Sequence, residues 1–146
     1  MDLQAAAELA AGAGVELAVE FHPDTLTDTA CSTVALLDEV GRGLATYWQP
    51  PVGEPDADAL GGLQAVLART VTVHVFSWWP ARDRLALSAR DGLWRAVCAQ
   101  LVAESTREVM PMLLEFVPDD NPAAVLREAS TLRELVRFGR PQPAGH

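Results

Sequence analysis

Positive charge is scarce in this sequence. The 146 residues include 11 Lys and Arg against 20 Asp and Glu, which gives a formal net charge of -9 at pH 7. Proteins that bind a nucleic-acid backbone do so mainly through clustered Lys and Arg side chains. The composition therefore argues against a nucleic-acid partner. The excess of acidic groups favours solubility and does not specify a fold.

Cysteines and long apolar runs are also few. The two cysteines, Cys31 and Cys98, are far apart and form no metal-binding spacing such as CxxC. We expect both to be reduced and structural, which suits a cytoplasmic protein. No apolar run reaches membrane-spanning length and no basic secretory signal is visible, so no membrane partner is expected. Glycine-rich nucleotide motifs of the P-loop and dinucleotide types are missing as well.

Apolar residues make up 49% of the chain, and they follow two different patterns. Short apolar runs predict buried strands at residues 15–21, 44–48, 71–77 and 111–117. Apolar residues at helical spacing predict helices at residues 3–11, 28–40, 56–69 and 88–108, and a last helix that begins at 122 and includes 136. Asp56 or Asp58 is expected to cap the third helix, and Asn121 the last one, with Pro122 at its first position.

This order of elements predicts an α/β fold. Strands that are apolar throughout and alternate with helices are typical of a parallel sheet covered by helices. We expect one helix followed by four βα units in a single domain over residues 1–138. The Pro- and Gly-rich segment 139–146 is expected to be a flexible tail.

One polar or charged residue stands at or near the end of each predicted strand. These residues are Glu20, Gln49, His74 and Glu115, and they are spaced by about one βα unit each. In parallel α/β folds, functional groups collect at the carboxyl ends of the strands. A carboxylate inside an apolar strand is costly unless it is paired, hydrogen-bonded or bound to a metal. Two carboxylates and an imidazole suit a divalent cation such as Mn²⁺, Co²⁺, Mg²⁺ or Zn²⁺.

Each of these residues also has a structural interpretation. A single strand-end Glu can serve as a hydrogen-bond partner, and His74 alone can be a satisfied core histidine. His22 fits a strand cap, a substrate contact or a ligand. The pair Trp78-Trp79 fits either the core or a surface on which a sugar stacks, and Arg82 lies in a segment expected to be a solvated loop, where an arginine can hold a polar substrate group.

Three segments together resemble the xylose isomerase-like TIM barrels, a superfamily that includes sugar-phosphate isomerases and epimerases. Residues 20–23 (EFHP) resemble the middle strand of these barrels. Residues 73–77 (VHVFS) resemble their later His-containing strand, and residues 113–117 (LLEFV) resemble their last, Glu-bearing strand. The resemblance covers about residues 10–137, and it depends on the order and spacing of short motifs.

The resemblance implies a metal-dependent isomerase or epimerase. Glu20, His74 and Glu115 would be metal ligands, and Glu20 and Glu115 would also be catalytic. One glutamate would remove the proton next to a substrate carbonyl, giving an enediolate on the metal, and the proton would return to another carbon or to the opposite face. The substrate would be a small sugar, a sugar phosphate or a related hydroxy-carbonyl compound, bound with help from His22, Trp78 and Arg82.

The sequence departs from the family pattern at two ligand positions. The family usually has an aspartate ligand where this chain has Gln49, whose amide oxygen is a weaker, neutral ligand. A second histidine is also frequent where Thr72 stands. Both departures bear on metal affinity.

The sequence also departs in length. A TIM barrel needs eight βα units and typically about 250 residues, whereas this chain supplies four units and resembles the C-terminal half. We therefore expect a half-barrel that pairs with a second copy, that associates with a missing N-terminal half, or that stays open. The alternative to an enzyme is a non-catalytic half-barrel that acts as an assembly or binding module. An endonuclease branch of the same superfamily is disfavoured by the acidic charge.

Overall fold

The computed structural model describes residues 2–139 and contains a four-stranded parallel sheet with five α-helices. The chain runs through α1 (Leu3–Gly12), β1 (Leu17–Glu20), α2 (Ala30–Val40), β2 (Leu44–Trp48), α3 (Asp56–Val66), the 3-10 turn η1 (Leu67–Arg69), β3 (Thr70–Val75), β4 (Ser77–Trp78), β5 (Arg84–Leu85), the turn η2 (Leu87–Arg90), α4 (Asp91–Glu104), β6 (Met112–Leu114), the turn η3 (Pro118–Asp120) and α5 (Pro122–Gly139). The predicted α/β class and parallel sheet are confirmed.

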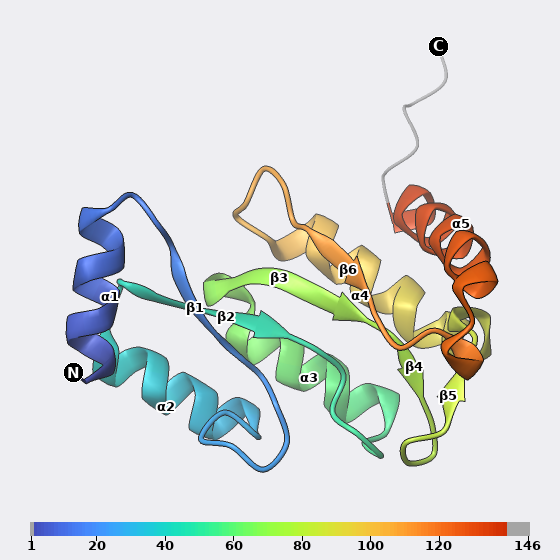
Figure 1. Cartoon of the computed structure of the whole chain (residues 1–146), viewed down its shortest axis with the longest axis horizontal. Helices are drawn as coiled ribbons and strands as arrows, with labels where there is room; N and C mark the ends of the chain where they lie inside the picture. The colour runs from blue at the N-terminus through green and yellow to red at the C-terminus, as the bar shows by residue number, and fades with distance from the viewer. Residues whose placement is uncertain (1, 140–146) are drawn as a thin grey trace.

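The sheet is wound in one direction only. Its strands lie in the order β1-β2-β3-β6, which is their order along the chain, and all three pairings are parallel. The helices follow the same order, because α2 packs against α3, α3 against α4, and α4 against α5. Right-handed crossovers that all step the same way place their helices on the same face of a sheet. Figure 1 shows α1 and α5 at opposite ends of this row.

The hydrophobic core lies between one face of the sheet and the helices. Trp48, Val73 and Val75 from the strands contact Leu63 and Trp94 from α3 and α4 in one buried cluster. Alternate strand residues point the opposite way. The opposite face therefore carries the side chains at the intervening positions, among them those of the candidate site.

Several predicted boundaries are wrong. The helix expected at 88–108 begins as η2 and ends at Glu104, because Ser105 is extended (φ -68°, ψ 133°). The strand expected at 71–77 ends at Val75, and Ser77 starts a two-stranded antiparallel hairpin with β5 that had not been expected. Arg84, the last residue of the segment 82–84 expected to be a loop, therefore belongs to a strand.

The expected helix caps are confirmed in part. Pro55 is the N-cap of α3, so Asp56 and Asp58 lie inside its first turn and do not cap it. At α5, the side chain of Asn121 accepts a hydrogen bond from the Ala123 N–H at 2.9 Å, as a cap does. The expected tail at 139–146 begins with the last residue of α5, and residues 140–146 lie outside the described residues.

Both cysteines are free thiols, as expected, with Cys31 exposed in α2 and Cys98 buried in α4. Among residues 2–139, no helix combines the length and the apolar character needed to cross a bilayer.

Candidate functional site

The four strand-end residues lie at the same edge of the sheet. Glu20 is the last residue of β1, Gln49 follows β2, His74 is the last but one of β3, and Glu115 follows β6. The strand register aligns Glu20 with Tyr47, and His74 with Leu113 two residues before Glu115. The carboxyl ends of parallel strands thus bring together side chains that are far apart in the sequence.

His74 lies between two carboxylates. Its Nδ1 atom is 3.4 Å from Oε1 of Glu20 and 3.2 Å from Oε2 of Glu115. The His74 side chain is only 8% exposed, whereas those of Glu20 and Glu115 are 45% and 29% exposed. Neither contact has hydrogen-bond geometry, so Nδ1 is a buried polar atom that faces two carboxylates without a hydrogen-bond partner among the described residues. The ring of Tyr47 packs against the imidazole at 5.4 Å between centroids.

Burial and charge act on Glu115 in opposite directions. Burial of the carboxyl is the largest effect and raises its pKa above the ordinary value. The nearby His74 lowers the pKa, and the negative charge of Glu20 raises it again. Glu115 therefore keeps a proton to higher pH than an exposed glutamate does.

Local hydrogen bonds fix the end of β1. The hydroxyl of Thr27 donates to the carbonyl of Glu20, and the Phe21 N–H donates to the Tyr47 carbonyl at 2.9 Å. The hydroxyl of Thr25 donates to the His22 carbonyl at 2.7 Å. The loop after β1 is thus folded back on the strand end and fixes the backbone at Glu20.

A cavity of about 140 Å³ opens beside this cluster. Five of the residues predicted to belong to the site line it: Glu20, His22, Gln49, Trp78 and Arg82. The aromatic rings of Phe76 and Phe116 complete the wall. Of the three clustered residues only Glu20 lines the cavity; His74 lies behind it, and Glu115 contacts His74.

Three aromatic rings form one side of the cavity. The centroid of Trp78 is 5.0 Å from that of Phe76 and 4.7 Å from that of Phe116. Phe116 adopts a left-handed backbone (φ 48°), which is unusual for a bulky residue and turns the chain directly after Glu115. The rings are tilted against one another by 48° to 86°, so they form an angled apolar wall against which the apolar face of a small ring can pack.

Arg90, the last residue of η2, holds the backbone of the β4–β5 hairpin at Trp78. The buried Arg90 donates to the Trp78 carbonyl at 3.2 Å and to Oδ1 of Asp56 at 2.5 Å. Its guanidinium also stacks on the ring of Trp79, 5.2 Å from the centroid. The two tryptophans therefore differ, since Trp78 lines the cavity and Trp79 packs against Arg90.

The donor chemistry of the cluster fits a divalent metal ion. Two carboxylates and an imidazole nitrogen are suitable ligands, and the buried Nδ1 of His74 has no hydrogen-bond partner in the described part of the chain. Within residues 2–139, however, no three His, Cys, Asp or Glu side chains already stand in a metal-holding group. The observed contacts are pairwise, from one nitrogen to each carboxylate, so a metal would require the side chains to reorient.

Sequence reasoning missed Tyr47, Phe76 and Phe116. Phe76 and Phe116 flank predicted site residues, but apolar strands do not reveal which face a side chain occupies. Tyr47 could be assigned to the site only from its position opposite Glu20, and that position is known only once β1 and β2 are paired.

No model of a known protein family matches this chain, and no curated protein matches it.

Proposed function

We propose that this chain is the C-terminal half of a xylose isomerase-like TIM barrel and that it serves a metal-dependent isomerase or epimerase. The observation that carries the proposal is the placement of His74 Nδ1 between the carboxylates of Glu20 and Glu115 at the carboxyl edge of the sheet. The substrate class is a small sugar, a sugar phosphate or a related hydroxy-carbonyl compound.

The winding of the sheet supports the half-barrel. In a βα barrel, strands and helices follow each other around the ring in chain order, with every helix outside. The described strands and helices keep chain order in this way. A doubly wound sheet would instead reverse its strand order near the middle and bind its ligand at that switch point. Four strands are half of the eight that a TIM barrel needs.

The site residues have different roles in the proposed reaction. A divalent ion held by Glu20, His74 and Glu115 would polarise the substrate carbonyl and stabilise the negative charge that develops on it. Glu20, which lines the cavity, is suited to accept a proton from the carbon next to the carbonyl. Glu115 would be ionised when it binds the ion and would help to hold it beside His74. His74 faces both carboxylates from its buried position and would complete the ligand set.

The cavity walls are suited to hold the substrate. Trp78 and Phe116 offer an aromatic surface, and the exposed side chains of His22 and Arg82 offer polar contacts at the cavity mouth. Gln49 is buried in the same wall and can present its amide oxygen as a weak ligand or a substrate contact.

Hydrogen exchange into substrate tests this function. The chain, loaded with Mn²⁺ in D₂O, is incubated with a panel of ketoses and aldoses, and deuterium next to the carbonyl is measured by mass spectrometry. We expect incorporation that falls by at least about 100-fold in Glu115→Gln. Glu134→Gln, an exposed glutamate on α5, is the matched control and should be unchanged. Equal incorporation in both variants would refute the assigned roles.

A non-catalytic half-barrel is the second candidate. It is favoured by Gln49, which stands where a charged ligand would bind a metal more tightly, and by the two edge strands of the sheet. It predicts that the chain assembles normally when Glu20 is replaced by Gln and that no sugar exchanges hydrogen with solvent.

A further inference from the structure

A cavity of about 260 Å³ opens at the amino edge of the sheet. Its charged lining residues are Glu16, Arg42, Arg69 and Arg107, and the start of β2 at Leu44 forms part of its wall. From this cavity β2 leads to Gln49 at the carboxyl edge, a distance of roughly 16 Å at about 3.3 Å per residue. The cavity is therefore separate from the candidate site described above.

Three successive connections from a helix to a strand each supply one arginine to this cavity. Arg42 lies between α2 and β2, Arg69 is the last residue of η1 directly before β3, and Arg107 lies between α4 and β6. The amino ends of parallel strands share one edge of the sheet, so the loops before them meet there. Three of the 11 basic residues thus gather at one cavity of a chain whose net charge is -9.

Arg69 is held in place by backbone carbonyls. Its Nε donates to the Leu44 carbonyl at 3.1 Å, and its Nη2 donates to the carbonyls of Gly41 and Leu44. These bonds offset the negative carbonyl end of α2, which would otherwise repel an anion. Nη1 of Arg69 forms no hydrogen bond with any of residues 2–139. The guanidinium is thus fixed in advance and keeps N–H donors for a ligand.

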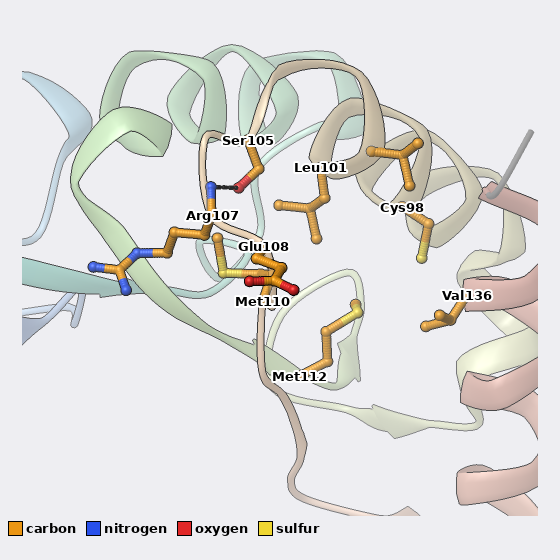
Figure 2. A pocket seen from close by; sticks show the side chains of 9 residues that line it. Cys98, Leu101, Ser105, Arg107, Glu108, Met110, Met112 and Val136 are labelled. Carbon is orange, nitrogen blue, oxygen red and sulfur yellow. Dashed lines mark hydrogen bonds between the residues drawn. The ribbon is translucent and has the colours of Figure 1, made fainter.

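Arg107 and Arg42 complete the charged lining. Arg107 pairs with Glu16, and this ion pair joins the loops before the first and the last strand of the sheet. Figure 2 shows the Arg107 side chain pointing away from Met112 and Val136, which line a neighbouring cavity. Arg42 is exposed and forms no salt bridge with the described residues. Three positive charges and one negative charge give the lining a net charge of +2.

The charge and size of this cavity suit a phosphate group. A phosphate monoester carries a charge of about -1.5 to -2 at pH 7, which balances the charge of the lining. Guanidinium groups bind phosphate oxygens through parallel N–H···O bonds. The volume is below the roughly 300–1,000 Å³ of pockets that enclose drug-sized ligands, so a small ion or ester fits better than a larger molecule. A purely structural role explains the contacts of Arg69 and Arg107, but it does not account for Arg42.

We propose that this cavity binds a phosphate group, either as inorganic phosphate or as the end of a small phosphate monoester. Nη1 of Arg69 supplies the fixed donors. Arg107 adds the donors that its pair with Glu16 leaves unused, and the exposed Arg42 covers the anion. The inference does not rest on the function proposed above, because none of these residues belongs to the candidate site.

Calorimetric titration with inorganic phosphate, at a constant ionic strength set by chloride, tests the site. Arg42→Gln should weaken phosphate binding by about tenfold, because it removes one charge-assisted contact. Glu16→Gln should tighten phosphate binding by at least about threefold, because the competing carboxylate is lost. Arg133→Gln is the matched control and should leave the affinity unchanged, since Arg133 is exposed on α5 and forms no salt bridge with the described residues. Equal affinity in all four proteins would show an adventitious ion only and would overturn the proposal.

Further ligands and one further variant identify the anion and its place. Tighter binding of glycerol phosphate supports a monoester as the ligand, and tighter binding of inorganic phosphate supports the free ion. Succinate should bind at least about tenfold more weakly, because each carboxylate offers fewer oxygens than a phosphate group, and equal binding would overturn phosphate as the ligand class. A loss of phosphate binding in Arg82→Gln but not in Arg42→Gln would place the anion in the candidate site and overturn the proposal. Mn²⁺ titration of the same proteins without phosphate reports on the proposed function separately.

Discussion

The ion pair between Arg90 and Asp56 should stabilise both the fold and the cavity wall. The Arg90 side chain is 5% exposed, and its guanidinium contacts the Asp56 carboxylate, the Trp78 carbonyl and the Trp79 ring. Replacing Asp56 by Ala leaves a buried cation without its counterion. The loss of one partner of a fully buried pair costs about 3–5 kcal/mol.

The expected cost is smaller here because Asp56 is half exposed. Its side chain is 50% accessible, so water can reach the vacated position and solvate part of the charge. We expect Asp56→Ala to lower the free energy of unfolding by about 2 kcal/mol, which corresponds to a fall in Tm of roughly 4–8 °C for a chain of this size. Urea unfolding followed by circular dichroism and tryptophan fluorescence measures it.

Asp58→Ala is the matched control. Asp58 is exposed in the same first turn of α3 and forms no salt bridge with the described residues. Both substitutions remove a negative charge from the helix N-terminus, worth about 0.3–1 kcal/mol, so their difference isolates the ion pair. A difference below about 0.5 kcal/mol would refute the stabilising role of the Arg90 contact.

Three further predictions concern the site and the core. In metal-free protein, the pKa of Glu115 is raised, so the folded state holds the proton at a pH at which the unfolded state has lost it. The free energy of unfolding should therefore fall as the pH rises above the ordinary pKa of 4.5. Glu115→Gln should flatten this dependence of the unfolding free energy on pH, and an unchanged dependence would contradict the pKa shift. Burial raises the pKa of the Cys98 thiol to about 11, so at pH 8 a thiol reagent should modify Cys31 quickly and Cys98 only on unfolding; two fast thiols would show that Cys98 is accessible. Leu63→Ala removes a fully buried side chain from the centre of the core and should cost about 2–5 kcal/mol in urea unfolding, whereas a cost below 1 kcal/mol would mean that this core is not close-packed.

The regular part of the fold could be predicted from local patterns. The bounds of β2 agree with the prediction because Gly43 and Pro50 bracket a short apolar run. The helix predicted at 88–108 is too long because no glycine or proline marks its end among the polar residues 105–108, whereas the backbone at Ser105 is already extended. The β4–β5 hairpin was missed because strands of two residues have no periodicity to detect.

The residues at the strand ends could be predicted from the sequence, whereas the residues that surround them could not. The proximity of Glu20, His74 and Glu115 could be predicted because polar residues at the ends of parallel strands meet at one edge of the sheet. The role of Arg90 could not be found, since its partners Asp56 and Trp78 come from elements separated by more than ten residues. The left-handed backbone at Phe116 brings its ring to Trp78. It could not be predicted, because the residue is neither glycine nor asparagine, the types that favour this conformation.

Metal titration tests the central claim most directly. The chain is stripped with a chelator, titrated with Mn²⁺ by isothermal calorimetry, and compared with the double variant Glu20→Gln/Glu115→Gln and with Glu134→Gln as control. The account predicts one ion per chain for the unmodified protein and the control, and at least about a hundredfold weaker binding in the double variant. Equal binding in all three proteins, or no binding in any, would contradict a metal site formed by Glu20, His74 and Glu115.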